Sequence, residues 1–158
     1  MNFLSYSNIR TLGFYLFLIG FACLPVWSVE RFLNQDGSPH IYNAYIVLEL
    51  FKHNPAFTEI YSLNSAPLPN LSGHYLLTLL LIFFSPFVVT KIMVSLTFAG
   101  LTAAIAWLRM QVCGPDADLK MSVLLGAALA FNWMWLLGFY NFIIGVIGFA
   151  FALGLYWR

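Results

Sequence analysis

The stretch that decides the fold is the uncharged run of residues 121 to 157, which reads MSVLLGAALAFNWMWLLGFYNFIIGVIGFAFALGLYW. A helix rises 1.5 Å per residue, so a single helix over this run would be much longer than the roughly 30 Å hydrocarbon core of a bilayer. The run must therefore break. Gly138–Asn141 supplies a glycine and polar side chains near its middle, and we expect two membrane-spanning helices, over 121–137 and 142–157.

The composition of the whole chain fits a membrane protein. Of its 158 residues, 61% are hydrophobic and 8% are charged, and the mean hydropathy is +0.84. A soluble domain carries about 25% charged residues. The composition therefore excludes a soluble enzyme, a disordered region and a disulfide scaffold. A net charge of +1 gives no electrostatic reason to expect a nucleic-acid partner. Cys23 and Cys113 are expected to be unpaired thiols.

Outside residues 121 to 157, three more apolar segments are long enough to suggest helices in a membrane. We therefore expect an all-α fold, a polytopic transmembrane helix bundle of about five spans that forms a single transmembrane region over 1–158. The expected spans are 11–29, 75–89, 92–108, 121–137 and 142–157, and 30–74 is a long first outer loop. Basic residues are too few to fix the orientation firmly. We choose a cytoplasmic N-terminus with the long loop outside.

The loop over 30–74 holds four of the six acidic residues and all three histidines. Ser38 followed by Pro39 is typical of a helix start, because serine caps a helix and proline fits its first position. Apolar residues then recur every three or four positions, at Ile41, Ala44, Tyr45, Leu48 and Phe51. This spacing predicts an amphipathic helix of about 14 residues that lies flat in the membrane interface, with that stripe toward the lipid, and ends at Asn54–Pro55.

Asp36 lies just ahead of this helix, where the helix dipole favours an ionised carboxylate. Such a group could act as a general base or a metal ligand, or it could simply begin a surface helix. His40 lies within reach of Asp36, and His74 stands at the mouth of the next apolar segment. The spacing of these three residues matches no metal signature, so no metal site is assigned. Histidines in this position can also serve only as anchors at the lipid headgroups.

Three short motifs carry a resemblance to a known family. They are Asp-Gly-Ser-Pro-His at Asp36–His40, Pro-Asn-Leu-Ser-Gly-His at Pro69–His74, and Gly-Phe-Tyr-Asn-Phe at Gly138–Phe142. With the long first outer loop, they resemble the N-terminal region of C-type (GT-C fold) membrane glycosyltransferases, and more closely a group of bacterial multi-spanning membrane proteins. Those proteins run several hundred residues further. The resemblance implies that this chain is the N-terminal part of a larger protein in a bacterial cytoplasmic membrane.

The resemblance also implies a reaction. In glycosyltransferases of this fold, an acidic residue of the first outer loop accepts the proton of the acceptor hydroxyl as it attacks the sugar of a polyprenyl-phosphate donor. By position, that catalytic residue is Asp36, and Gly37 stands where the family usually has a second acid. His40, His74 and Asn70 are the expected substrate-binding residues. The expected partners are membrane lipid and a polyprenyl-phosphate-linked sugar, while the cofactor and the oligomeric state are left open.

Two alternatives remain beside the glycosyltransferase reading. One is a non-catalytic membrane protein, such as a transporter subunit or an assembly partner, and the other is an inactive fragment. A transporter should carry paired ionisable residues or broken helices at mid-membrane depth, and the first three expected spans have neither. Five crossings would place Gly138–Asn141 on the cytoplasmic side. Tyr140 and Asn141 are therefore expected to bond between helices, away from Asp36.

Overall fold

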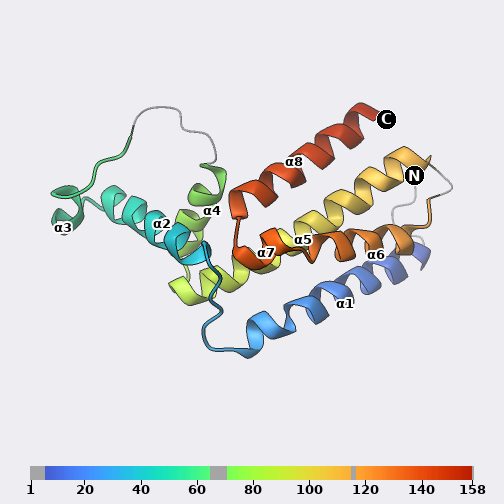
Figure 1. The fold of residues 1–158 in the computed structure, drawn as a ribbon, viewed down its shortest axis with the longest axis horizontal. Coiled ribbons are helices and arrows are strands. Elements are labelled where there is room, and N and C mark those ends of the chain that lie inside the picture. Colours follow the sequence, from blue (N-terminus) through green and yellow to red (C-terminus); the bar gives the residue numbers. More distant parts are fainter. Residues whose placement is uncertain (1–5, 65–70, 115–116, 158) are drawn as a thin grey trace.

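The computed structural model describes residues 6–64, 71–114 and 117–157, and contains helices but no strand within these ranges (Figure 1). This confirms the expected all-α class. The helices are α1 (Tyr6–Ser28), α2 (Gly37–Phe51), α3 (Pro55–Thr58), α4 (Ser72–Leu81), α5 (Pro86–Cys113), α6 (Leu119–Ala130), α7 (Trp133–Leu137) and α8 (Tyr140–Trp157).

Three helices in the described ranges are long and apolar enough to cross a membrane. They are the Arg10–Ser28 part of α1, the whole of α5 and the whole of α8. These three overlap the spans expected over 11–29, 92–108 and 142–157. The chain is therefore consistent with a membrane-embedded helical protein. The expected count of about five spans is not confirmed, because α4 and α6 are shorter apolar helices.

The segment expected to form one span over 75–89 does not form one helix. α4 ends at Leu81, and α5 begins at Pro86 after Ser85 in an extended conformation. Proline lacks an N–H and disfavours a helical conformation in the residue before it, so Ser85–Pro86 starts a new helix instead of continuing the old one. The ten residues of α4 measure about 15 Å, roughly half the thickness of the hydrocarbon core.

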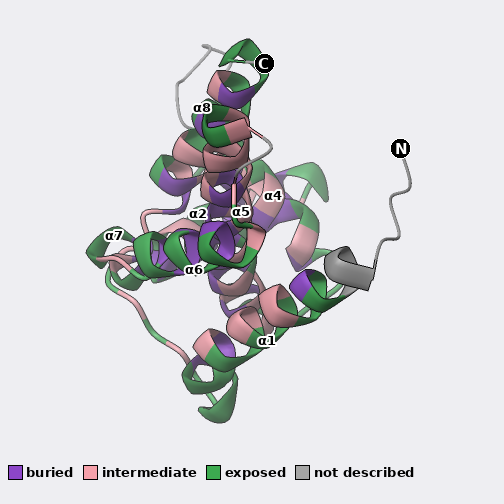
Figure 2. Ribbon diagram, turned by 90° about the vertical axis from the view of Figure 1, so that its right-hand side faces the viewer, coloured by how far each residue is buried: buried purple, intermediate pink, exposed green. Residues whose placement is uncertain are grey.

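α5 is the central helix of the bundle, and α1, α6 and α8 pack around it (Figure 2). Met93, Val94 and Phe98 of α5 are almost completely buried. The indole N–H of Trp135 donates to the Val94 carbonyl at 2.9 Å, which fixes α7 against α5. Tyr15 and Trp27 of α1 also donate hydrogen bonds to α5. The core is therefore built mainly on the surface of α5.

The contact between α5 and α6 depends on a glycine. A Cβ atom added at Gly126 would lie 2.4 Å from the backbone oxygen of Thr102. Small residues of this kind let membrane helices approach closely, and in lipid this close packing replaces much of the hydrophobic driving force.

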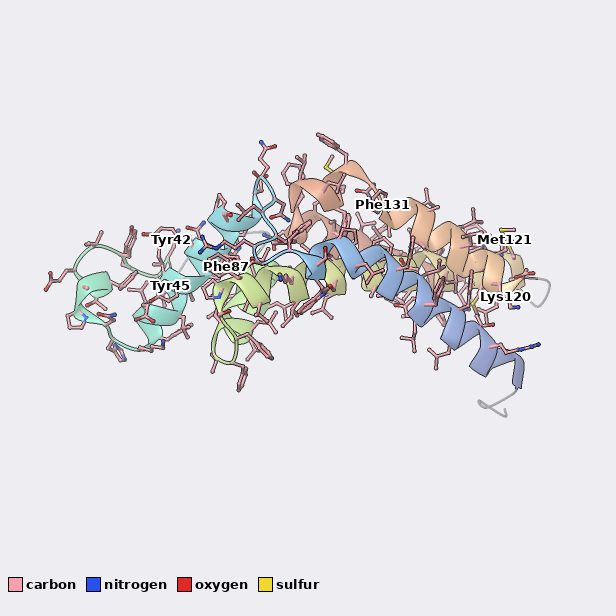
Figure 3. The ribbon with its side chains drawn as sticks, turned by 90° about the horizontal axis from the view of Figure 1, so that it is seen from below. Tyr42, Tyr45, Phe87, Lys120, Met121 and Phe131 are labelled. Carbon is pink, nitrogen blue, oxygen red and sulfur yellow. The ribbon has the colours of Figure 1, made fainter. Side chains whose placement is uncertain are left out.

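The long helices place four chain segments at one end of the bundle. These segments are the C-terminal end of α1, the N-terminal end of α5, the α7–α8 junction, and α2 to α4 (Figure 1). The C-terminal ends of α5 and α8 lie at the opposite end. Figure 3 likewise places Tyr42, Tyr45 and Phe87 at the first end, and Lys120 and Met121 at the other. The expectation that Gly138–Asn141 lies away from Asp36 is therefore wrong. The expectation depended on a complete crossing over 75–89, and α4 is shorter than the helices that are long enough to cross a membrane.

The amphipathic helix expected in the outer loop is present as α2, with two differences. It begins at Gly37 with Asp36 as its N-cap, before the expected Ser38. Its buried residues Ile41, Ala44 and Leu48 belong to the same core cluster as Leu77 of α4. The apolar stripe thus packs largely on protein, while Tyr45 and Phe51, which were expected to share that face, are exposed. α2 ends at Phe51, close to the end expected at Asn54–Pro55. Asn54 is the N-cap of the next helix, α3.

Candidate functional site

Three polar segments that are far apart in the sequence meet at the end of the bundle that carries α2. The backbone N–H of Asp36 donates to the Leu137 carbonyl at 2.9 Å. The backbone N–H of Gly73 donates to the side-chain oxygen of Asn141 at 2.7 Å. We call this region the polar junction and define it as Asn34, Asp36, His40, Gly73, His74, Tyr140 and Asn141. All three sequence motifs contribute to it.

Tyr140 and Asn34 close the polar junction from the α8 side. The Asn34 amide nitrogen donates to the Tyr140 hydroxyl oxygen at 3.0 Å, and Tyr140 itself is almost fully buried. The segments can approach because glycines lie between them. A Cβ atom at Gly138 would lie 2.6 Å from the Asn34 amide nitrogen, and the φ angle of Gly138 is +84°, which disfavours any other residue. A Cβ atom at Gly37 would overlap the Asn34 side-chain oxygen.

The Asp36 side chain at the start of α2 has no hydrogen-bond or ion-pair partner within the described residues. Asp36 is the N-cap residue, but its carboxylate accepts no capping hydrogen bond. With its backbone at φ −101° and ψ −8°, it departs from the extended geometry that lets an N-cap side chain reach the next amides. The carboxylate makes no hydrogen bond or ion pair with another residue in the described ranges, and the residue is half-buried. An unengaged acid of this kind can meet a ligand.

His40 and His74 form a direct contact between α2 and α4. Nδ1 of His40 lies 3.3 Å from Nε2 of His74, and the two rings meet edge to face with centroids 5.0 Å apart. Nδ1 of His74 is buried and has no hydrogen-bond partner in the part of the chain that the structure describes. Burial lowers the pKa of His40, the nearby His74 lowers it further, and the negative charge of Asp36 acts in the opposite direction. His40 is therefore electrostatically coupled to both neighbours.

A cavity of about 720 Å³ lies next to the polar junction, between α2, α4 and residues 61–64. Its volume falls within the range of about 300–1,000 Å³ that is usual for small-molecule sites. Its lining includes the polar side chains of Asn43, Ser62, Asn64, His74 and Thr78 and the apolar side chains of Ile46, Val47, Leu50, Leu63 and Leu71. His74 belongs to both the cavity wall and the histidine pair, so a molecule in the cavity would reach the polar junction.

The basic residues at this end of the bundle mostly hold helices together. The Lys91 ammonium donates to the carbonyl of Val29 and lies 5.6 Å from the Trp27 ring centre, which fixes the end of α1 against α5. The Arg31 guanidinium lies 4.7 Å over the ring of Phe87. These contacts are structural. In the described part of the chain, no group of three or more His, Cys, Asp or Glu residues could hold a metal ion.

The structure therefore brings together most of the residues expected from the sequence and adds others. Asp36, His40 and His74 lie at one place, while Asn70 lies outside the described residues. Asn34, Tyr140 and Asn141 were not expected to belong to the site. The Gly-Phe-Tyr-Asn-Phe motif was the signal for two of them, but the span count assigned it to the wrong end.

Comparison with known proteins does not add a family assignment. No protein-family model, no curated protein and no solved structure matches this chain. The function must therefore be argued from the polar junction and its surroundings.

Proposed function

We propose that this chain is the N-terminal part of a membrane glycosyltransferase, which moves a sugar from a polyprenyl-phosphate donor to an extracytoplasmic acceptor. The observation that supports the proposal is the unengaged, half-buried carboxylate of Asp36 at the start of α2. It lies where apolar helices end, in the polar junction, whose His74 lines a cavity with apolar and polar walls. The resemblance of the loop motifs to C-type glycosyltransferases points to the same reaction.

The reaction needs a base at the boundary between water and lipid, where both the acceptor and the lipid-linked donor can reach it. The acceptor hydroxyl oxygen forms a bond to the anomeric carbon of the sugar, the bond from that carbon to the donor phosphate breaks, and the phosphate leaves with the electron pair. Asp36 takes the hydroxyl proton as the acceptor attacks. His40, His74 and Asn70 are the proposed substrate-binding residues, and His74 is the one that also lines the cavity.

We infer that the chain crosses the membrane four times, through α1, α5, the pair α6–α7, and α8. Residues 119 to 137, from the start of α6 to the end of α7, measure about 28 Å at 1.5 Å per residue, close to the thickness of the hydrocarbon core. α4 remains on one side. With a cytoplasmic N-terminus in a bacterial inner membrane, the polar junction faces outward, and so does the Gly138–Asn141 break.

The test is sugar transfer by the full-length protein in isolated membranes, with a radiolabelled polyprenyl-phosphate sugar as donor. Asp36→Asn should reduce transfer at least about 100-fold, which is typical for loss of a general base. Glu30→Gln is the matched control, because Glu30 is an acid of the same loop whose side chain is 91% exposed. Equal transfer by the Asp36→Asn variant would remove the assigned base. A lack of transfer by the unsubstituted protein would contradict the proposed activity itself.

A further inference from the structure

We propose that His40 and His74 act as one acid–base unit that takes up a single proton, and that this proton resides on His40, beside Asp36. In the reaction this unit would relieve Asp36 of the proton taken from the acceptor, a role that rests on the proposed function. The proton count and its location rest on the geometry of the pair alone.

The contact between the two rings allows one additional proton. Nδ1 of His40 and Nε2 of His74 lie 3.3 Å apart, and a hydrogen bond between them needs one donor and one acceptor. If both imidazoles were protonated, both nitrogen atoms would be donors and two positive charges would face each other. The pair must then separate. A second proton is therefore excluded for as long as α2 and α4 remain in contact through these rings.

The surroundings of the pair place the proton on His40. When His40 donates from Nδ1, His74 accepts at Nε2 and carries its own proton on Nδ1, which is buried and has no partner among the described residues. In a cationic His74 the same unpartnered N–H would belong to a charged group, and leaving a buried charged donor unpaired costs more than leaving a neutral one unpaired. A cationic His40 can donate from Nδ1 to His74. It also lies within electrostatic reach of the Asp36 carboxylate.

The groups that face His40 are few. Asp36 faces it from its own helix, His74 from α4, and the neutral phenol of Tyr140 from α8, with ring centroids 6.0 Å apart. The Tyr140 hydroxyl is engaged by Asn34. Burial and His74 lower the pKa of His40, so His40 is neutral at pH 7 and able to accept a proton.

The step balances without any further reactant. After the acceptor oxygen has bonded to the sugar and the phosphate has left with the electron pair, Asp36 carries the hydroxyl proton. Its transfer to His40 restores the carboxylate and leaves an imidazolium next to it. His40 acts through Asp36 and is a positioning and proton-storing residue.

The experiment is a pH titration of the full-length protein, labelled with ¹⁵N-histidine, in detergent micelles. The chain has three histidines, and the exposed His53 serves as an internal reference. We expect the pair to take up one proton, on His40, at a pH below the ordinary histidine pKa of about 6.5. Independent titration of both residues, or protonation of His74 before His40, would overturn the proposal.

A pair of variants tests the coupling to Asp36. Asp36→Asn should move the titration midpoint of His40 to lower pH, because the carboxylate raises the pKa of His40. Glu30→Gln should leave it in place. An unmoved midpoint in the Asp36→Asn variant would overturn the placement of the proton beside Asp36. These readouts do not depend on sugar transfer. If the histidines do not titrate as expected while Asp36→Asn still abolishes sugar transfer, this inference is wrong and the proposed function stands. If they titrate as expected while Asp36→Asn leaves transfer unchanged, the proposed function is wrong and this inference stands.

Discussion

The side-chain oxygen of Asn141 accepts a 2.7 Å hydrogen bond from the backbone N–H of Gly73, across 68 residues of sequence. Leu71, the N-cap residue of α4, has no side chain that can cap the helix. Asn141 at the start of α8 therefore supplies the missing cap from another helix. Because His74 follows Gly73 directly, the position of α8 also sets the position of His74 in the polar junction.

Replacing Asn141 by leucine should weaken this end of the fold. The substitution removes the acceptor but keeps a side chain of similar size, and losing a helix cap costs about 0.5–2 kcal/mol. Asn141→Asp, which keeps an acceptor oxygen, is the matched control. Thermal unfolding of the full-length protein in detergent measures the difference. If the leucine variant unfolds at the same temperature as the aspartate variant, Asn141 is not a functional cap for α4.

Glycine-to-alanine substitutions should destabilise the protein where two helices are in close contact and should not destabilise it on open helix faces. Gly126→Ala places a methyl group 2.4 Å from the Thr102 backbone oxygen, which cannot rotate away, and overpacking of this kind costs about 1–3 kcal/mol. Gly148→Ala meets no atom within 4 Å. In that position alanine should be neutral, or stabilising by up to about 1 kcal/mol, through its higher helix propensity. Equal unfolding temperatures for the two variants would contradict the packing of α5 on α6.

Much of the helical framework could be predicted from hydropathy and breaker residues. The uncharged run from Met121 to Trp157 had to break, and it does so at Gly138, whose positive φ angle ends α7. It also breaks at Phe131–Asn132, between α6 and α7, which divides the single helix expected over 121–137. The pattern failed where breaker residues divide an uncharged apolar segment. Residues 75–89 are continuous in hydropathy, but Ser85–Pro86 divides them into the end of α4 and the start of α5.

The expected span count also explains what was missed in the candidate site. Asp36, His40 and His74 were selected because polar residues are scarce and these three begin helices or border apolar segments. Only the count of five crossings places Tyr140 and Asn141 on the other side from Asp36. Hydrogen bonds such as the one between Asn34 and Tyr140 join residues 106 positions apart. No local pattern predicts such a contact, because it depends on how the helices pack.

Folding stability should decrease as the pH falls below about 6.5, the ordinary pKa of histidine. The pKa of His40 is lower in the folded protein, so between the two values the unfolded chain binds more protons than the folded one. Protonation then favours unfolding, and stability rises again as the pH increases. Urea unfolding at pH 5.5 and pH 7.5 measures the change. His40→Gln should reduce the dependence, whereas His53→Gln, at an exposed histidine, should not.

His53→Gly should stabilise the protein. His53 follows the C-terminal end of α2 with a φ angle of +54°, in the left-handed region that glycine adopts without strain. Residues other than glycine lose about 1–2 kcal/mol in that conformation, and part of this cost should be recovered. His53→Ala is the control, since it removes the imidazole but keeps the Cβ atom. A glycine variant no more stable than the alanine variant would mean that the turn is not strained.

The topology can be tested with the cysteine that the chain already carries. Cys113 is exposed at the C-terminal end of α5, opposite the polar junction, whereas Cys23 is buried. Four crossings with a cytoplasmic N-terminus place Cys113 in the cytoplasm, and five would place it outside. A membrane-impermeant maleimide should therefore label Cys113 only after the cells are permeabilised.

In a Cys113→Ser background, Ser38→Cys should react in intact cells, because Ser38 is exposed next to Asp36. Labelling of Cys113 from outside intact cells would indicate either five spans or the opposite orientation. An unreactive Ser38→Cys variant would place Asp36 beyond the reach of an extracytoplasmic acceptor.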